Sequence, residues 1–318
     1  MQIKVGIVII YFGHWPDWIY SFINSCERNT DIDFILINDS QKVVSDSKNI
    51  KYIFFTIDEF NTLASKKLGF GVQVKNPYKV CDFKPAVGKI FEDHLKEYDY
   101  WGVSDIDLVL GDFSQVLLKI HNNKYDFLSF YKEFISAPFF LMRNTSYLNS
   151  IYRQIKDHKK YLSRYEYCGL DENNKLAGKK PGILKRVSNI LKYVIINLLN
   201  LNFFKLTNAE LKFNLYWHLK KEELIFPGDF TEVVHLLTRQ KKIKSLFLNF
   251  MESDKSFNRK GIIEWEVEYR NGKIFETRLK KEILIFHFLK SKNSVNFRVS
   301  DNISCEFSIT QNGISNYG

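Results

Sequence analysis

The sequence has few of the features that mark disulfide-stabilised, zinc-binding or membrane-spanning proteins. Its 318 residues include four cysteines, which are widely separated and form no Cys-X-X-Cys pair. That spacing implies neither a zinc site nor a disulfide framework. No uncharged apolar stretch is long enough to cross a bilayer. The first residues, Met1–Val8, predict a strand and lack the apolar run and cleavage site of a signal peptide. These absences predict a protein of the reduced cytoplasm.

Two common phosphate-binding signatures are also missing. No Gly-X-Gly-X-X-Gly follows the first predicted strand, and no Gly-Lys-Ser/Thr loop occurs. A dinucleotide-dependent oxidoreductase and a P-loop enzyme are therefore disfavoured. The net charge is +10, but zinc-finger spacing, a basic zipper and an aromatic-basic RNA signature are all absent. We expect the positive charge to serve a phosphate-bearing substrate or an anionic membrane surface, and no nucleic acid.

The remaining pattern is that of an α/β protein. Ile3–Ile10 is nearly all aliphatic, as in a strand buried on both faces. A helix is predicted over Asp17–Arg28 and a second strand over Asp33–Asn38. This β-α-β unit predicts a parallel sheet with a right-handed crossover. Further along, the periodicity predicts these elements: a strand over Ile50–Thr56, helices over Ile57–Leu68 and from Pro85 to about Lys96, a helix over Phe113–Asn122, strands over Tyr125–Tyr131 and Ala137–Asn144, and a helix from Thr145 to about Lys160.

Polar and aromatic residues follow the first two strands. Ligands of such sheets collect beyond the carboxyl ends of the strands. Tyr11 and Phe12 follow the first strand and Asp39 follows the second, so all three are candidates for binding a nucleotide. Asp39 could bind a base or a ribose hydroxyl. It is equally suited to a turn in which its carboxylate accepts backbone hydrogen bonds.

The stretch Tyr98–Asp112 contains the most informative pattern. Aromatic and β-branched residues predict a buried strand, and Asp105 and Asp107 follow it one residue apart. Side chains at positions i and i+2 of an extended segment point to the same side. Two carboxylates there suit Mg²⁺ or Mn²⁺, with phosphate oxygens completing the shell. The alternative is a strand that runs into an acidic turn.

Two other segments carry candidate site residues. Lys84 precedes a proline at a predicted helix start and could bind phosphate or sugar, or simply be a surface charge. Asp171 and Glu172 adjoin a glycine loop, where they could orient an acceptor or assist proton removal. The alternative for this pair is a solvated acidic turn.

After residue 174 the sequence becomes basic and has the apolar spacing of a helix. Lys179–Thr207 has apolar residues at alternating spacings of three and four with several lysines, which predicts a basic amphipathic helix. Such a helix docks at a membrane interface or packs on the protein's own core.

Near the end, Asn271-Gly272 predicts a two-residue hairpin turn, and Glu282–Lys292 predicts a strand. His287 is a candidate metal ligand and Lys290 a candidate diphosphate partner; a packed core histidine is the alternative for His287.

Five segments together resemble the GT-A-fold glycosyltransferases, and in particular a group of bacterial transferases found with capsule and cell-surface polysaccharide genes. The segments that carry the resemblance are Tyr11–Pro16, Pro77–Ala86, Trp101–Asp107, Asp171-Glu172 and Phe286–Lys290. The resemblance implies a nucleotide-diphospho-sugar donor, a UDP-sugar above all, and a divalent cation held by Asp105 and Asp107. By similarity to glycogenin-like enzymes it also implies His287 as a ligand, although no His-X-X-Gly string surrounds it.

The sequence therefore predicts a metal-dependent glycosyltransferase that builds bacterial capsule or lipopolysaccharide, with a glycan or lipid-linked acceptor. The resemblance implies a GT-A-like core over residues 1–174, with a Rossmann-type mixed sheet flanked by helices. We expect a helical basic insertion over 175–235 and a β-rich part over 236–318 that completes the site. The protein would be cytoplasmic, or peripheral on the inner face of the membrane. Alternatives are an Mg²⁺-dependent nucleotidyl- or phosphotransferase using the same aspartates, and a non-catalytic membrane-associated binding protein.

Overall fold

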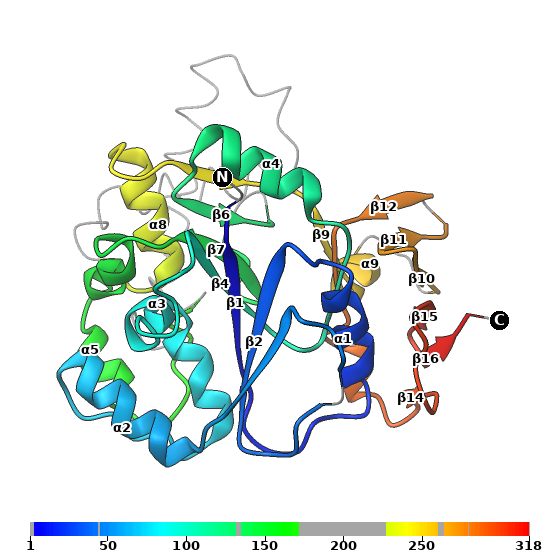
Figure 1. Ribbon diagram of the computed structural model, residues 1–318, viewed down its shortest axis with the longest axis horizontal. Coiled ribbons are helices and arrows are strands. Elements are labelled where there is room, and N and C mark those ends of the chain that lie inside the picture. Colours follow the sequence, from blue (N-terminus) through cyan, green and yellow to red (C-terminus); the bar gives the residue numbers. More distant parts are fainter. Residues whose placement is uncertain are drawn as a thin grey trace, which may run out of the picture.

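The computed structural model describes residues 3–43, 45–131, 135–171, 227–259, 264–278 and 280–317. It confirms the predicted mixed α/β class: a large mixed sheet is flanked by helices, and a second sheet forms near the C-terminal end (Figure 1). Glu172 and the predicted helix at 179–207 lie outside the described residues, as does most of the predicted insertion. Among the helices of the described ranges, none is long and apolar enough to span a membrane.

The main sheet has seven strands in the order β3-β2-β1-β4-β7-β6-β8. Their bounds are β1 Val5–Ile10, β2 Ile32–Asn38, β3 Ile50–Phe54, β4 Tyr100–Ser104, β6 Phe127–Ser129, β7 Phe139–Arg143 and β8 Ser245–Phe247. β1 pairs in parallel with β2 and β4, and β2 pairs in parallel with β3. The carboxyl ends of these strands share one edge, so Tyr11, Asp39 and Asp105, each the first residue after its strand, lie along that edge.

Helices cover both faces of this sheet (Figure 1). α1 (Ile19–Glu27) and α4 (Ser114–Asn123) contribute to the apolar core on one face. The core on the other face takes residues from α2 Ile57–Leu68, η1 Pro77–Ala86, α3 Val87–Ile90, η2 Leu148–Gln154, α5 His158–Leu162 and α8 Phe230–Arg239. Along β1, Ile7 and Ile9 belong to the first core and Val8 to the second. Burial on both faces explains the nearly continuous aliphatic sequence of β1.

Two of the predicted helices are wrong in extent. The helix expected to reach about Lys96 ends at Ile90 and is preceded by the 3₁₀ helix η1. The side-chain amide of Asn144 donates to the carbonyls of Leu95 and Tyr98, at 2.7 and 2.9 Å. This long-range contact fixes a turn that local sequence does not signal. Likewise, the helix expected from Thr145 to about Lys160 is divided into η2 and α5.

A three-stranded sheet, in the order β5-β13-β9, adjoins the end of β4. Its strands are β5 Leu108–Leu110, β13 Ile285–His287 and β9 Met251–Ser253. β13 is antiparallel to β5, with His287 opposite Leu108, and parallel to β9, with His287 opposite Ser253. This pairing places the end of β13 beside Asp107.

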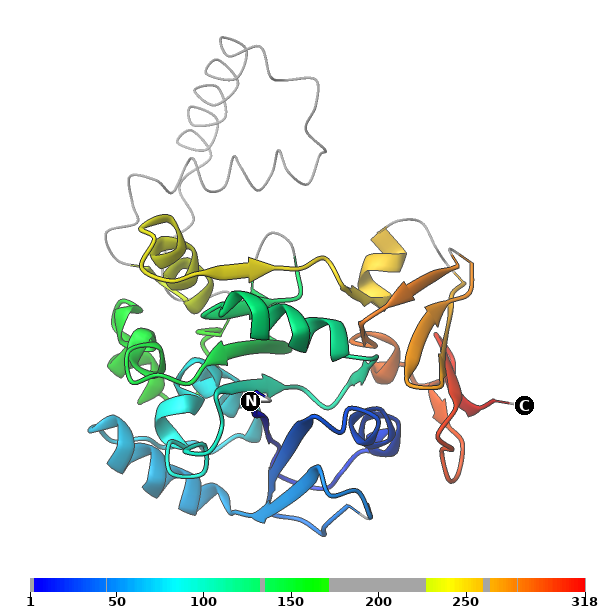
Figure 2. The same ribbon diagram turned by 45° about the horizontal axis from the view of Figure 1, so that its top comes forward.

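The remaining strands form a six-stranded sheet at one side of the molecule, beside α1 and away from α2 and α5 (Figures 1 and 2). Its strands, in spatial order, are β12 Lys281–Ile283, β11 Lys273–Glu276, β10 Glu266–Arg270, β15 Phe307–Thr310, β16 Gly313–Asn316 and β14 Arg298–Val299. The predicted turn at Asn271-Gly272 joins β10 to β11, and both residues have positive φ, 50° and 75°. Two short helices, α9 (Asp254–Arg259) and η4 (Ser291–Asn293), flank β9 and β13 in sequence.

Candidate active site

A cavity of about 660 Å³ opens at the carboxyl edge of β1 and β4. Its walls come from the β1 end, η1, the β4–β5 loop, the segment around Tyr167 and the ends of β9 and β13. Residues more than 270 positions apart in the chain therefore share one space. The cavity brings together seven of the predicted site residues: Tyr11, Phe12, Lys84, Asp105, Asp107, Asp171 and His287.

One charged cluster in the cavity is centred on Asp107. Its carboxylate oxygen Oδ2 lies 3.0 Å from Nε2 of His287 and also accepts a hydrogen bond from Nζ of Lys292. Asp107 and His287 are both buried, with 4% of each residue exposed. Burial raises the pKa of the Asp107 carboxyl, but the combined effect of His287 and Lys292 is larger and of opposite sign. The pKa therefore lies well below its ordinary value. Asp107 is thus an ionised carboxylate over the neutral pH range.

A second cluster is centred on Lys84, from the last turn of η1. Its Nζ lies 2.6 Å from Oδ1 of Asp105 and 3.8 Å from Oδ2 of Asp171, and it donates to the Ala137 carbonyl at 3.1 Å. Burial lowers the pKa of Lys84, while the charges of Asp105 and Asp171 help to raise it above its ordinary value. The lysine is therefore a buried cation held between two carboxylates.

The predicted nucleotide-binding residues divide between two spaces. Tyr11 and Phe12 line the main cavity, whereas Asp39 lines a second cavity of about 680 Å³ together with Trp15 and Phe54. The rings of Tyr11 and Trp15 stack at 5.2 Å with an interplanar angle of 13°. Oδ1 of Asp39 accepts a hydrogen bond from the Gly13 amide at 2.7 Å. The turn role considered for Asp39 is thus present in the structure.

Lys290 does not line the main cavity, whereas Lys292 does. Lys290 is exposed, and its backbone amide donates to Oδ2 of Asp254 at 2.8 Å. The predicted strand over Glu282–Lys292 is two short strands, and β13 ends at His287. A turn follows, so the alternation of an extended chain does not hold beyond His287. The sequence reasoning missed Lys292 for that reason, and it also missed Tyr167, whose hydroxyl donates to Oδ1 of Asp171 at 2.9 Å.

The chemistry of Asp107 and His287 fits two neighbouring ligands of one divalent cation. A carboxylate oxygen and an imidazole nitrogen are both donor types that could hold such an ion, and here they lie 3.0 Å apart, at hydrogen-bond distance. Asp105 points instead to Lys84. Within the described ranges no three His, Cys, Asp or Glu residues gather into a metal-binding group. For Asp105 to join the other two, it would have to part from Lys84.

Several solved glycosyltransferase structures resemble this chain at low identity. The galactosyltransferase LgtC, in complex with donor and acceptor sugar analogues, is 11% identical with a TM-score of 0.33; the match covers 49% of this chain and 64% of LgtC. GlyE of Streptococcus pneumoniae TIGR4 is 12% identical with a TM-score of 0.32, over 92% of this chain and 55% of GlyE. Mouse xyloside xylosyltransferase 1 is 8% identical with a TM-score of 0.39, over 92% and 100%. The match thus spans less than two thirds of LgtC and of GlyE.

Sequence comparison gives a more definite result. No curated protein is significantly similar to the chain. One family does match, the "Family of unknown function (DUF6625)", over residues 7–318. The match runs from within β1 to the end of the chain and includes every residue of the two charged clusters. The chain therefore belongs to the family DUF6625.

Proposed function

We propose that this protein is a metal-dependent glycosyltransferase, which moves a sugar from a nucleotide-diphospho-sugar to a hydroxyl of an acceptor. The observation that carries the proposal is the pair of charged clusters in one cavity. Asp107, His287 and Lys292 form one cluster, and Lys84, Asp105 and Asp171 form the other. Each cluster includes an aspartate that follows β4, at the edge where the carboxyl ends of the parallel strands meet and where α/β proteins bind nucleotides.

The charges suit a departing diphosphate. Mn²⁺ or Mg²⁺ would be held by Asp107 and His287, with Asp105 as a third ligand, and would stabilise the negative charge that develops on the leaving group. Lys292 is a flexible cation at the same carboxylate and is suited to bind a diphosphate oxygen. When a ligand arrives, Lys292 exchanges its contact with Asp107 for one with phosphate.

The second cluster is suited to the sugar. Lys84 is protonated and held between Asp105 and Asp171, so it donates hydrogen bonds without losing its charge. Asp171 is suited to accept a hydrogen bond from a sugar or acceptor hydroxyl, and Tyr167 orients its carboxylate through Oδ1. Glu172, which follows in the sequence, is assigned the same general role on sequence grounds alone.

The nucleotide is expected along the β1 edge. Tyr11 and Phe12 line the main cavity, and Trp15, stacked on Tyr11, leads to the second cavity beside Asp39. We propose a UDP-sugar as the donor, with the uracil and its ribose on this side. For the acceptor we propose a glycan or lipid-linked glycan of a bacterial surface polysaccharide, with the enzyme in the cytoplasm or on the inner face of the membrane.

The test is product analysis with a panel of UDP- and GDP-sugars and Mn²⁺. Wild-type protein should release a nucleoside diphosphate and the free or transferred sugar. Asp107→Ala should lower the rate by about 100-fold or more, because it removes a group that acts on developing charge. Asp112→Ala is the matched control, since Asp112 is an exposed aspartate of the same stretch that does not line the cavity.

Each outcome has a defined meaning. Equal turnover in wild type and Asp107→Ala contradicts the proposed metal role. Release of pyrophosphate without a nucleoside diphosphate would support the nucleotidyltransferase alternative instead. Binding to anionic vesicles that survives loss of both aspartates, without any sugar-nucleotide affinity, would support a non-catalytic membrane protein.

A further inference from the structure

The 3₁₀ helix η1 has a buried face that the proposed chemistry does not use. Tyr78 and Lys84 of this helix line the main cavity. Lys79 and Asp82 point elsewhere and are almost completely buried, with 0% and 1% of each residue exposed. A lysine and an aspartate this deeply buried are unusual, because removing both charges from water is costly. Their position needs a reason other than solubility.

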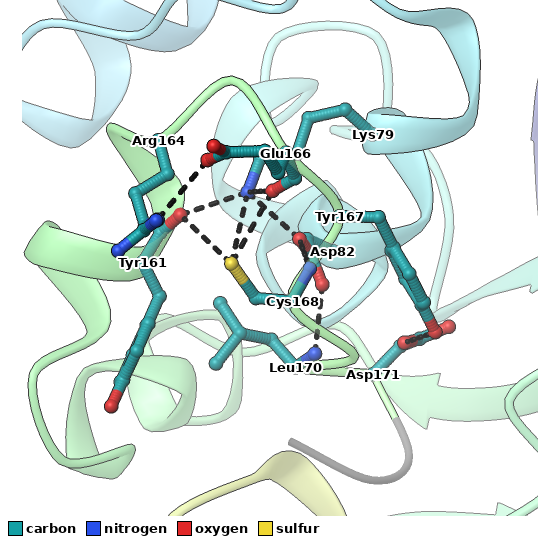
Figure 3. Close-up of polar contacts among 9 residues, drawn as sticks. All are labelled: Lys79, Asp82, Tyr161, Arg164, Glu166, Tyr167, Cys168, Leu170 and Asp171. Carbon is teal, nitrogen blue, oxygen red and sulfur yellow. Dashed lines mark hydrogen bonds and ion pairs between the residues drawn. The ribbon is translucent and has the colours of Figure 1, made fainter. Parts of the chain in front are cut away.

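Lys79 joins η1 to the chain segment around Glu166. Its Nζ donates to Oδ2 of Asp82 and to the backbone carbonyls of Tyr161 and Glu166, each at 2.8 Å (Figure 3). These three acceptors match the three N–H bonds of an ammonium group. The thiol sulfur of Cys168 lies 3.7 Å from the same nitrogen.

Asp82 holds the next part of the same segment. Its Oδ2 accepts from the backbone amide of Cys168 at 2.7 Å, and its Oδ1 accepts from the amide of Leu170 at 2.8 Å (Figure 3). Together with the carbonyl of Glu166, the buried pair thus contacts the backbone at residues 166, 168 and 170. Tyr167 lies between the first two anchors and Asp171 follows the last, and both line the cavity.

We propose that Lys79 and Asp82 are positioning residues that fix Tyr167 and Asp171 against the cavity. Lys79 and Asp82 belong to η1, the helix that also carries Lys84. By binding the segment that ends at Asp171, the pair keeps Nζ of Lys84 and Oδ2 of Asp171 at a fixed separation of 3.8 Å. The assignment of a role to Asp171 rests on the function proposed above; the fixing of the segment does not. The ring of Tyr78, next to Lys79, meets the ring of Tyr167, next to Cys168, at 4.8 Å, so the pair also sets this aromatic contact.

A purely stabilising purpose explains the pair poorly. Apolar residues of similar volume usually stabilise a buried site as well as an ion pair does, or better. What apolar residues cannot supply is an acceptor for two backbone amides and a donor for two backbone carbonyls. The pair is therefore suited to fixing one conformation of a segment with no helix or strand from residue 163 to residue 171.

The test compares wild type with the double variant Lys79→Met/Asp82→Leu, in which neither charge is left unpaired. The control is Lys67→Met, which removes a lysine paired with Glu92 and Asp93 outside the cavity. Amide hydrogen exchange of residues 166–171 and alkylation of the buried Cys168 are followed in the native protein, with modified cysteines identified by peptide mapping. We expect both rates to rise at least about tenfold in the double variant and to stay unchanged in the control.

The proposal would be overturned if Cys168 and these amides were as well protected in the double variant as in wild type. If the double variant does not fold, Lys79→Gln/Asp82→Asn gives the same measurement, because two amide side chains remove the ion pair, leave no charge unpaired and keep some polar partners for the segment. This readout needs no enzymatic activity, so it decides the role of the ion pair even if no sugar nucleotide is turned over and the proposed function fails.

Where transfer is detected, a second readout separates positioning from general stability. Asp82→Asn should lower kcat for the sugar nucleotide and leave the affinity for UDP unchanged, because Asp171 faces the sugar side. The factor by which Asp82→Asn lowers kcat should be at least about tenfold smaller in a protein that already carries Asp171→Asn than in wild type, because Asp82 acts through Asp171. Independent, multiplicative effects of the two substitutions would contradict this relation.

Discussion

Nε2 of His287 lies 3.0 Å from Oδ2 of Asp107, although 180 positions separate the two residues. The contact depends on one strand pairing: β13 runs antiparallel to β5 with His287 opposite Leu108. In the same pairing region the Phe288 amide donates to the Asp107 carbonyl at 3.2 Å. Backbone hydrogen bonds thus fix the relative position of the carboxylate and the imidazole before any ligand binds.

The first prediction concerns metal binding at this pair. Mn²⁺ should raise the melting temperature of the wild-type protein, because an ion that binds the folded state stabilises it by mass action. His287→Ala should remove most of that increase, since one of two adjacent ligands is lost. Thermal unfolding followed at several Mn²⁺ concentrations gives the measurement. His94→Ala, which removes an exposed histidine outside the cavity, should behave as wild type; equal loss in both variants would exclude a specific ligand role.

The second prediction contrasts two lysines of the same turn. Lys292→Met should weaken UDP binding roughly 10- to 100-fold, the usual effect of losing a hydrogen bond to a charged group. Lys290→Met should leave UDP binding unchanged, because Lys290 is exposed and does not line the cavity. Isothermal titration of both variants, in the presence of Mn²⁺, provides the comparison. Equal weakening would mean that net charge, and not contact, governs binding.

The third prediction concerns Gly88, whose backbone lies close to the side chain of Trp101 in the central strand β4. A Cβ at Gly88 would meet the Trp101 indole at 2.4 Å and Oδ1 of Asn149 at 2.6 Å. The Trp101 ring is fully buried and its Nε1 donates to that same oxygen at 2.7 Å. Gly88→Ala should therefore lower the free energy of unfolding by about 1–3 kcal/mol. Urea denaturation measures the change.

Gly71→Ala is the control for this substitution. Apart from Gly71 itself and its chain neighbours, no atom lies within 4 Å of a Cβ at this position, and φ of Gly71 is not positive. The free energy of unfolding should change by no more than about 0.5 kcal/mol, as for most surface substitutions. A loss at Gly71 as large as at Gly88 would show that the effect comes from the loss of glycine and not from contact with Trp101.

The fourth prediction concerns acid. Because the pKa of Asp107 in the folded protein is below its ordinary value, its ionised form stabilises the fold above the unfolded pKa near 3.9, and this stabilisation disappears as pH falls through the folded pKa. The difference in unfolding free energy between wild type and Asp107→Asn should decrease as the pH falls below about 4. Urea titrations across this range test the sign. A difference that grows with acidity would contradict the assigned charge state.

Candidate residues at the strand ends could be predicted from the sheet, whereas Lys292 and Tyr167 could not. The aliphatic run of β1 and the β-α-β unit predict a parallel sheet, and from the sheet follows the edge on which Tyr11, Asp105 and Asp107 lie. Lys292 was missed because the chain turns after His287. The turn is held by Asp254, whose Oδ2 accepts from the amides of Lys290 and Ser291 at 2.8 and 2.7 Å, a contact across 36 positions that no local pattern contains.

The relation of Lys84 to Asp171 also lay beyond local pattern. The sequence suggested each residue separately, as a cleft lysine and as part of an acidic pair. Their proximity depends on Lys79 and Asp82, which carry charges and would be placed on the surface by composition alone. A buried ion pair of this kind becomes visible only when the backbone groups that satisfy it are known.

The pairing of β13 with β5 also sets a length requirement during synthesis. Strands β1, β2 and β4 are complete once residue 104 has left the ribosome, yet His287 and Lys292 are synthesised more than 180 residues later. Until then Asp107 has neither partner, and one wall of the cavity is unfinished. A chain terminated before residue 285 would therefore lack β13 and, with it, His287 and the part of the cavity wall that this strand supplies.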